Sequence, residues 1–582
     1  MSGSQENTMN ITSIPIAAFR PKPPVRIDFD RFDTNSEEAL SALVKASKAI
    51  GNVDDHAACR DLSTHWSRVW PWFRSFARAV LRQEQPKTSA GFNSLVEFID
   101  SASNIVIHPT FPFAFKPELV FQTMNPILKS TPEVVALTFE LWLYASQMDL
   151  AQSRSLLHSI GVLFDAHASH EMPPVRRFTG GVLSQLEKVL GNRRWDVPGT
   201  FVKELIRVLS ASLAEMDYLS LWYLVLFPNA LIRSTKTLPL PSWNAKDAIR
   251  WISLLLRKLL SSPRDGFDYR ERQDITITCA VECMSYIEYC AIANAYFLIP
   301  ALDEGVLLSF MKARDLLIRD AERVNPVPMM TLTYHFCMIC KLLLFRMLHR
   351  PISVRLSHCI KKIGEAGLDV DDISFTVAPL NKFRTAWTEL KNEVLRRSSV
   401  QERYGPTLRI CESLKCTNLG GGFDLKTSAT HSFMRCSGCQ SSVYCSEGCQ
   451  KDAWVDGHRY ACRAIQQNIK GGTYPRTPGM LEMRFAQHQL TADYEGLEDR
   501  VRQLRREYAV RHPNEKDAPI PWLDYRFNLP PDVSVCSLPE SRRRLKDFSQ
   551  DIRATMDLRS AVALAVVHWR GVDRDGDYIV RI

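Results

Sequence analysis

Residues 436–462 read CSGCQSSVYCSEGCQKDAWVDGHRYAC, and this stretch is unusually dense in cysteine. With two cysteines just upstream, the candidate metal ligands are Cys411, Cys416, Cys436, Cys439, Cys445, Cys449, His458 and Cys462. The chain has 15 cysteines, and seven of them fall between positions 411 and 462. Structural zinc sites take four thiolate or imidazole ligands in a tetrahedron. Eight ligands therefore predict two closed zinc sites, with no position left for a reacting water.

The spacing of these ligands fits such geometry. Two residues separate Cys436 from Cys439, which is the length of a tight knuckle. Cys445 and Cys449 are four positions apart, as are His458 and Cys462, so each pair is expected on one face of a helical turn. The alternative interpretation is a set of buried free cysteines, and the eightfold match favours metal over it.

Three further features make the pattern specific, namely the run Tyr444-Cys445-Ser446, the pair Cys449-Gln450 and the following Trp454. With them, residues 411–462 resemble a MYND-type zinc finger. The resemblance implies interleaved ligands, with one zinc on Cys411, Cys416, Cys445 and Cys449 and a second on Cys436, Cys439, His458 and Cys462. The sequence departs from the commonest pattern at the first site: four residues instead of two separate the first cysteines, and 19 residues precede Cys436.

The resemblance also implies a role in protein–protein interaction, because studied members of the family bind extended, proline-containing peptides. Here it implies a groove beside the second helix, with Gln450 as a polar contact, Trp454 as an aromatic wall and Ser437 at the knuckle. A tryptophan packs well against proline rings, and an amide can satisfy peptide groups that form no internal hydrogen bonds. The alternative is that Trp454 belongs to the core of a small domain, and both interpretations can hold together.

The charge of the finger does not favour nucleic acid. Residues 411–462 contain five basic and five acidic side chains, and seven thiolates with two zinc ions add about three negative charges. The whole chain carries a formal net charge of +9, and a short basic cluster occurs at Arg542 to Arg544. These features support an alternative function, a transcription- or chromatin-associated regulator that contacts nucleic acid through basic surface outside the finger.

The composition is that of a globular, intracellular protein. The chain has 582 residues, of which 45% are hydrophobic, and that length predicts about three to five structural units. Residues 1–20 lack the basic and apolar regions of a signal peptide, and no apolar stretch has the length and continuity of a bilayer span. We therefore expect reduced cysteines, no membrane partner and an intracellular location, with nucleus and cytoplasm both open.

The pattern of the remaining chain predicts a mainly α fold. We expect residues 1–35 to be a flexible tail and residues 36–400 to be an all-α domain, a solenoid-like array or an irregular bundle of helices. Glycines and prolines at 471–479 suggest a hinge before an α+β region at 480–582. In that region, residues 490–508 follow a helical seam, either a short coiled coil or a packed helix, and the last residues predict a hairpin that turns near Asp575-Gly576.

No enzymatic motif emerges from the sequence. One group of lysine methyltransferases carries a MYND finger within a SET domain, but the Asn-His-Ser-Cys type of motif that follows the finger there is missing here. A phosphate-binding glycine loop and a Gly-x-Ser-x-Gly elbow are missing as well. The sequence therefore predicts a non-enzymatic adaptor or scaffold that holds two zinc ions and binds a protein partner through a proline-containing segment. It leaves the oligomeric state open.

Overall fold

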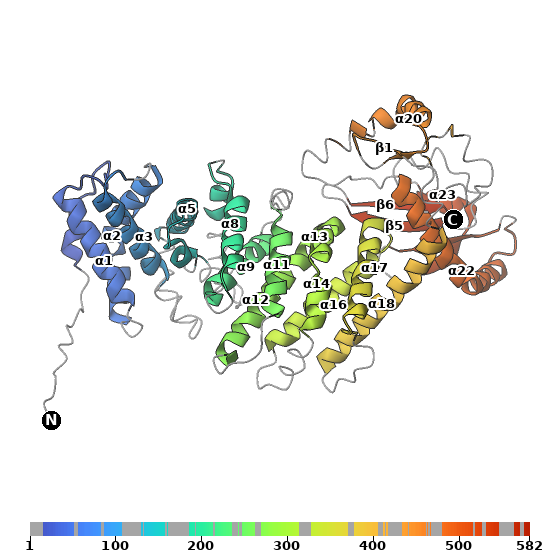
Figure 1. Cartoon of the computed structure of the whole chain (residues 1–582), viewed down its shortest axis with the longest axis horizontal. Coiled ribbons are helices and arrows are strands. Elements are labelled where there is room, and N and C mark those ends of the chain that lie inside the picture. Colours follow the sequence, from blue (N-terminus) through green and yellow to red (C-terminus); the bar gives the residue numbers. More distant parts are fainter. Residues whose placement is uncertain are drawn as a thin grey trace. The chain divides into compact units, whose positions relative to one another are not determined.

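The structure is a computed structural model, and the chain forms two compact units, Met1–Leu238 with Arg264–Glu282, and Pro239–Pro263 with Cys283–Ile582. It describes residues 15–51, 56–82, 86–107, 130–131, 133–157, 160, 185–192, 194–212, 216–234, 243, 247–261, 269–313, 327–369, 378–404, 411, 413, 415–416, 434–439, 442–460, 462–463, 466, 480–515, 518–525, 531–545, 564–570 and 575–581. Most of the described chain is helical, as predicted (Figure 1). The helices of residues 36–400 contribute to both units.

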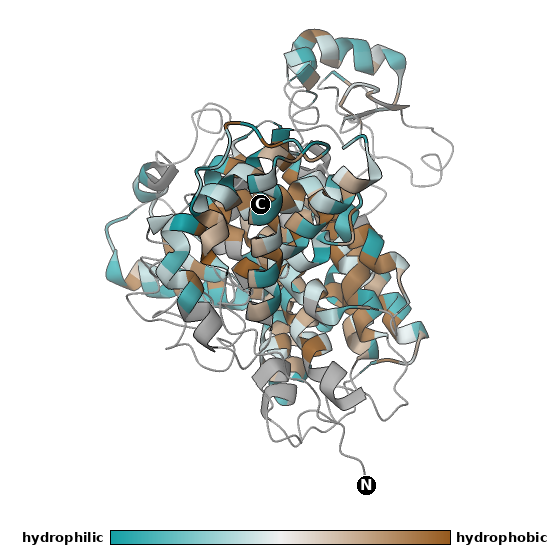
Figure 2. Cartoon of the chain, turned by 90° about the vertical axis from the view of Figure 1, so that its left-hand side faces the viewer, coloured by the Kyte–Doolittle hydropathy of each residue, from teal (hydrophilic) through white to brown (hydrophobic). Residues whose placement is uncertain are grey.

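The first unit is a series of helices that pack on their neighbours in sequence. Its elements are η1 (Ile16–Phe19), α1 (Thr34–Gly51), α2 (His56–Arg82), α3 (Ser89–Ile107), α5 (Glu133–Gln147), α8 (Val197–Ser210) and α9 (Tyr218–Ser234). Helix α1 packs on α2 and α3, α2 on α5, α5 on α8, and α8 on α9. Hydrophilic and hydrophobic residues alternate on the same helices (Figure 2), which is typical of helices that bury one face. Helix α5 is buried from Val134 to Ser146 with few exceptions, as its uniformly apolar sequence predicts.

The segment before α1 is packed, so the prediction of a flexible tail is wrong for residues 15–33. Phe19, Ile27 and Phe29 are each 3% exposed, and the Trp72 indole nitrogen donates a hydrogen bond of 2.9 Å to the Pro21 carbonyl. Three apolar side chains spaced among prolines follow neither a helical nor a strand period, so the pattern gave no sign of burial. Residues 1–14 lie outside the described part of the chain.

The second unit begins with another group of helices. They are α11 (Ala248–Leu260), α13 (Leu298–Asp303), α14 (Val306–Lys312), α16 (Val327–Phe345), α17 (Arg350–Glu365) and α18 (Ala378–Tyr404), while η3 is Ala295–Phe297. An apolar residue recurs every three or four positions from Ala248 to Leu259, which predicts an amphipathic helix. In α11 all five of these residues are buried: Ala248, Ile252, Leu255, Leu256 and Leu259. Phe310, Phe336 and Phe383 form an aromatic core between α14, α16 and α18, with the first two rings stacked 3.9 Å apart. Packing of this kind fixes each helix against the next.

Helix α12 (Tyr269–Ala293) contributes residues to both units and contains a long apolar stretch. By length and hydropathy alone, its stretch Ile275–Ala293 meets the requirements for crossing a membrane. However, 67% of that stretch is buried inside the structure, and core helices of globular proteins pass the same test. Its apolar character is therefore accounted for by packing against the protein itself.

The C-terminal region contains one long helix and a mixed sheet. Helix α22 (Met480–Arg511) precedes β3 (Ile520–Asp524), β4 (Asp532–Cys536), α23 (Leu538–Leu545), β5 (Leu564–Arg570) and β6 (Asp575–Arg581). The strand order is β4-β3-β5-β6, with β3 parallel to β5 and the other pairs antiparallel. The predicted α+β character is present, and α22 is a packed helix that contacts α18, β4 and β6 and buries Leu490 and Val501.

Two details of the sheet differ from the sequence prediction. The hairpin of β5 and β6 exists, but Asp575 and Gly576 belong to β6, where they pair with Arg570 and Trp569, and residues 571–574 lie outside the described part of the chain. Strand β3 was not named by the sequence analysis, and it contains Pro521, a residue normally excluded from central strands. Pro521 is tolerated because the pairing of β3 with β5 begins one residue later, at Trp522.

A buried polar network joins α18, α22 and β3. Arg397 is fully buried and donates hydrogen bonds to Asp493 and Glu393 at 3.1 and 2.7 Å, and Asp493 is 7% exposed. The Tyr525 hydroxyl donates to the same Asp493 carboxylate at 2.8 Å, and burial together with that carboxylate raises the pKa of Tyr525. Gln489 completes the set by donating to the Arg397 carbonyl at 3.2 Å. The network is satisfied on both sides, which is the condition under which a buried charge is tolerated.

Replacing Arg397 by alanine should lower the free energy of unfolding of this region by about 3 kcal/mol, because it breaks a buried ion pair and leaves Asp493 with only the partly exposed Arg396 as a cation. Hydrogen exchange of the α18 and α22 amides would measure the loss. Lys382→Ala, which removes an exposed cation from the same helix, is the control and should change exchange little. Equal exchange in both variants would contradict the role assigned to the network.

Candidate metal centre

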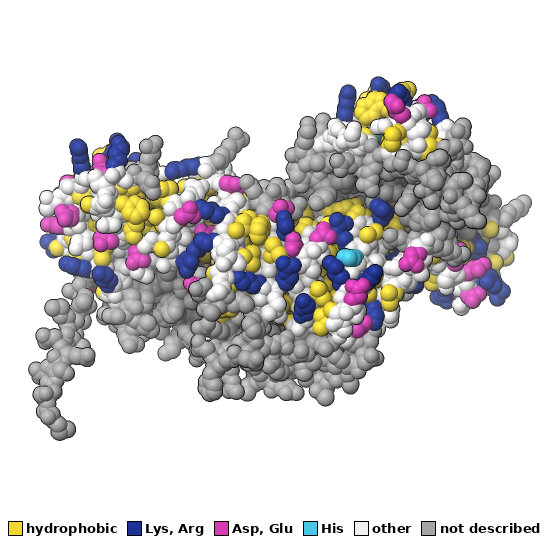
Figure 3. All heavy atoms as spheres, in the orientation of Figure 1, with side chains coloured by type: hydrophobic (Ala, Val, Ile, Leu, Met, Phe, Trp, Pro, Cys, Tyr) yellow, Lys and Arg dark blue, Asp and Glu magenta, His cyan; other side chains and the backbone are white. Residues whose placement is uncertain are grey.

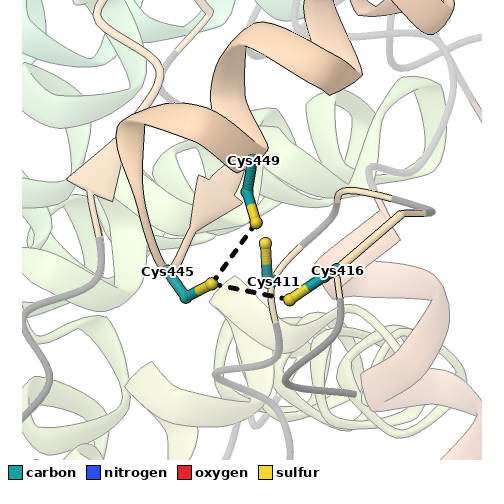
Figure 4. Close-up of side chains that lie close together, drawn as sticks. All are labelled: Cys411, Cys416, Cys445 and Cys449. Atoms are coloured by element: carbon teal, nitrogen blue, oxygen red, sulfur yellow. Dashed lines mark hydrogen bonds between the residues drawn. The ribbon is translucent and has the colours of Figure 1, made fainter. Parts of the chain in front are cut away.

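Four cysteines from two separated parts of the chain meet in a first cluster (Figure 4). Cys411 and Cys416 come from the segment before the finger's hairpin, Cys445 follows β2 (Val443–Tyr444), and Cys449 lies in α20 (Glu447–Ala453). The Sγ atom of Cys445 is 3.5 Å from that of Cys416 and 3.5 Å from that of Cys449. All four Sγ atoms lie within 4.8 Å of one another.

A second cluster contains three cysteines and one histidine. Cys436 and Cys439 flank the knuckle after β1 (Met434–Arg435), His458 ends the π-helical turn η6 (Trp454–His458), and Cys462 follows four residues later. The Cys436 and Cys462 Sγ atoms are 3.7 Å apart, and the Cys439 Sγ is 3.7 Å from the His458 Nε2. The imidazole therefore presents Nε2 to the thiols.

These distances fit zinc. With Zn–S bonds of about 2.3 Å, the ligand atoms of a tetrahedron lie about 3.8 Å apart, close to the observed 3.5 to 3.7 Å. The two clusters use alternate ligand pairs along the chain, which is the interleaved pairing that the resemblance implied. Both sets are closed, with four protein ligands each. Two four-ligand Cys/His clusters consistent with two zinc ions are thus present.

The comparison with protein families gives the same answer. The family model described as the MYND finger matches residues 415–462. Residues 415–462 form a MYND finger. No curated protein and no solved structure matches the chain, so the finger is the part whose family is shown.

The family match begins at Lys415, so Cys411 lies outside it. Geometry alone places Cys411 in the first cluster, where its side chain is buried with that of Cys416. The four-residue spacing between these cysteines, which departs from the commonest MYND pattern, still allows both Sγ atoms to reach Cys445 and Cys449. The departure therefore does not prevent a complete first site.

Short-range hydrogen bonds build the MYND finger around the ligands. Strands β1 and β2 pair antiparallel, and the Cys436 N–H donates to the Ser442 carbonyl at 2.9 Å. The Ser446 side chain caps α20 by accepting from the Cys449 N–H at 3.1 Å. Apart from the cysteines, the described core of the finger consists of Tyr444 and Ala453. Because so little apolar surface is buried, metal binding must supply much of the stability.

Two glycines are required for the second cluster. A Cβ on Gly438 would lie 2.8 Å from the Cys462 Sγ, so the knuckle can approach that ligand only with glycine at this position. Gly457 has a φ of +126°, a conformation that residues with side chains rarely adopt. This kink comes immediately before His458 and turns its imidazole toward the thiols.

The protonation of the ligands is set by their surroundings. Burial raises the pKa of Cys462 to about 12, so in the absence of metal this thiol keeps its proton. Burial acts in the same direction on Cys436, but hydrogen bonds from the Cys439 and Gly438 N–H groups outweigh it and lower the pKa of Cys436. Burial lowers the pKa of His458, which favours the neutral imidazole that a metal requires. A bound zinc ion would release the remaining thiol protons.

Ser442 is a site residue that the sequence reasoning missed. Its hydroxyl lies 3.3 Å from the His458 Nδ1, the ring nitrogen that faces away from the thiols, and Ser442 is 6% exposed. Metal-binding histidines generally hold their second ring nitrogen on a polar partner, which fixes the ring and the tautomer. With zinc on Nε2, Nδ1 would carry the proton and donate it to the Ser442 oxygen. The position of Ser442, between the knuckle and β2, was the feature of the sequence that could have indicated this role.

The predicted peptide-binding residues lie at the surface of the MYND finger. Trp454 is 41% exposed and its ring contacts that of His458 edge-on, with centroids 5.9 Å apart. Gln450 is half-buried, one helical turn before Trp454, and Ser437 is exposed on the knuckle. Trp454 thus packs on a zinc ligand while leaving part of its ring open, so both sequence interpretations of this residue remain compatible with the structure.

Metal analysis of the purified chain should return two zinc ions per molecule. Cys416→Ser and Cys462→Ser should each lower the zinc content by one, because each removes a ligand from a different cluster and leaves the other intact. Inductively coupled plasma mass spectrometry gives the measurement, and Cys536→Ser, a buried cysteine outside both clusters, is the control. One zinc ion in the unaltered chain would contradict the two-site assignment.

Ser442→Ala should weaken zinc binding at the second site by about 10- to 100-fold, because His458 loses the partner that orients its ring. Competition with a chromophoric chelator measures the affinity. Ser437 is an exposed serine on the knuckle of the same cluster, and Ser437→Ala should retain the original affinity. A Ser442→Ala variant with unchanged affinity would show that the Ser442–His458 contact does not tune the metal site.

Proposed function

We propose that this protein is a non-enzymatic, intracellular adaptor whose MYND finger recruits a protein partner through an extended, proline-containing segment. A MYND finger is a zinc-binding domain that typically mediates protein–protein interactions. The exposed aromatic surface around the second zinc cluster supports the recruitment of a proline-containing segment. Hydrophobic side chains of the finger lie open among basic and acidic ones (Figure 3).

This surface is larger than one side chain. Besides Trp454, Val455 is 73% exposed and Tyr460 is 61% exposed, and the three residues lie on and just after the π-helical turn. A small domain held by metal has no need to expose these apolar groups for its own stability. Exposed aromatic residues next to polar ones are typical of surfaces that bind protein segments.

A proline-containing segment suits this surface better than a helix or a strand. Such a segment adopts an extended helix without internal hydrogen bonds, so its ordering on binding costs little entropy. Trp454 offers a flat ring to a proline, and Gln450, one turn earlier on the same helical face, offers an amide to the peptide backbone. The contact with His458 holds the tryptophan ring in place before the partner arrives.

Binding of nucleic acid through Arg542 to Arg544 receives less support. Within α23, the exposed Arg543 guanidinium pairs with Glu540 at 3.4 Å. The side chains of Arg542 and Arg544 lie outside the described residues. The finger, with its balanced charge, offers nucleic acid no additional contact surface. The adaptor therefore remains our proposal.

Trp454→Ala should abolish binding of partners that carry proline-containing segments while leaving zinc content unchanged. The tagged full chain and the variant would be compared by affinity capture from the cells that produce the protein. Candidate segments from the lost partners would then be tested as labelled peptides by fluorescence polarisation, where we expect a loss of affinity of more than tenfold. Tyr334→Ala, which removes another exposed aromatic ring, from α16, is the matched control.

Zinc content must be measured in every variant, because Trp454 packs against the ligand His458 and its loss could disturb the site. Gln450→Ala provides a second change on the same face that touches no ligand ring. Unchanged peptide affinity in both Trp454→Ala and Gln450→Ala, at full zinc content, would contradict the proposed recruiting role.

A further inference from the structure

A second surface with binding potential lies in the first unit, in the segment that precedes α1. This segment is anchored over α2 by the buried side chains of Ile27 and Phe29, and the Phe29 ring lies 6.1 Å from that of Phe76. The hydrogen bond from Trp72 to Pro21 fixes its beginning. At its end, Asp30 accepts hydrogen bonds from Lys87 and Thr88, just before α3. The segment therefore forms one rigid wall beside α2.

A cavity of about 970 Å³ lies between this wall, the end of α2 and the residues before α3. Five basic side chains line it, and they come from three separate stretches of the chain: Arg26, Arg31, Arg78, Arg82 and Lys87. Arg78 and Arg82 are one helical turn apart on α2, so they project from the same face. Lys and Arg side chains project from the surface of the N-terminal helices in Figure 3.

The two acidic residues described in the lining of the cavity, Asp28 and Asp30, are already engaged. The Asp30 carboxylate accepts from the Thr88 hydroxyl at 2.6 Å and from the Lys87 and Thr88 N–H groups at 3.0 and 2.9 Å. These hydrogen bonds, the Thr88 side chain first, lower the pKa of Asp30, so it stays ionised with its oxygens occupied. Asp28 accepts from the Asp30 N–H at 3.0 Å. Asp30 therefore ties the wall to the residues before α3, and Asp28 accepts from the backbone of the wall itself.

The cations are not engaged in the same way. None of the five basic side chains forms an ion pair with another residue in the part of the chain that the structure describes. Among the described residues that line the cavity, two carboxylates stand against five cations, an excess of three positive charges. Like charges held around one hollow repel one another and concentrate anions from solution. All five side chains are exposed, so solvent and salt screen part of this repulsion and leave the cations accessible to an anion.

Gly91 shows that the position of the wall is built into the sequence. A Cβ at this position would lie 2.4 Å from the Asp30 Oδ1 and 2.9 Å from the Phe29 carbonyl oxygen. Only glycine lets the first turn of α3 approach the wall this closely. The approach holds Asp30 against Thr88 and thereby keeps Arg26 and Arg31 opposite Arg78 and Arg82.

We propose that this cavity binds a compact ligand that carries several phosphate groups. Its volume lies in the range of small-molecule sites, which is about 300–1,000 Å³. Guanidinium groups form paired hydrogen bonds with phosphate oxygens, and several phosphates can match the charge excess within one such volume. The described residues that line the cavity include no aromatic ring, which a nucleotide base or a single-stranded nucleic acid would need for stacking.

The site is independent of the adaptor role, because it lies in the other compact unit from the MYND finger and shares no residue with it. It gives the first unit a chemical role that the finger does not supply. A bound polyphosphate would neutralise the repulsion between the cations of the wall and those of α2. The first unit should therefore become more resistant to unfolding when the ligand is bound.

Isothermal titration calorimetry of the full, zinc-loaded chain would test the site, with inositol hexakisphosphate and tripolyphosphate as probes. We expect one molecule of probe per chain, with weaker binding as salt is raised. The double variant Arg78→Ala/Arg82→Ala should lose more than tenfold in affinity. The affinity of Arg78→Lys/Arg82→Lys should lie between those of the unaltered chain and the double alanine variant, because the charge is kept but the paired hydrogen bonds are lost.

Lys45→Ala/Lys48→Ala is the matched control, since it removes two exposed cations one turn apart on α1 that do not line the cavity. It should bind the probes as the unaltered chain does. The proposal is overturned by an absence of binding at low salt, by several probe molecules per chain, or by an equal loss in the control. It is also overturned if a polyglutamate peptide or a single-stranded RNA binds the cavity as tightly as the phosphate probes.

Discussion

Coordination of zinc by eight side chains is the constraint on which the MYND finger depends. The described core of this domain contains Tyr444, Ala453 and the ligand cysteines themselves, and such a core cannot stabilise a fold by hydrophobic burial alone. Every other local feature serves the ligands: the knuckle after Cys436, the cap at Ser446 and the kink at Gly457. Because metal rather than packing holds the domain, aromatic side chains such as Trp454 and Tyr460 stay partly exposed at its surface.

The helical units follow the opposite principle. Their helices are held by side chains such as Trp72, Phe310 and Trp387, which are fully buried, and by a few fully satisfied polar networks. Burial of this kind accounts for the long apolar run in α12 as well. Arg397 enters the core between α18 and α22, where several polar partners meet it. These units present extended surfaces, and one of them carries the basic cavity near α2.

A protein with two such surfaces can bring two ligands together. The finger offers an apolar, aromatic surface suited to a protein segment, whereas the first unit offers a concave, cationic one suited to phosphate. Binding at the finger depends on the burial of apolar area, whereas binding at the cavity depends on charge and therefore on salt concentration. Binding at the two sites can therefore be separated experimentally by ionic strength.

The sequence by itself determined the zinc ligands, the helical class and the terminal hairpin, because these depend on spacing and periodicity between residues close along the chain. It did not determine the packed N-terminal segment, the strand containing Pro521, the role of Ser442 or the meeting of Arg26 and Arg31 with Arg78 and Arg82. Each of these depends on contacts between residues that no local period relates. Only the tertiary structure decides which side chains face one another across such distances, since burial and charge act through space.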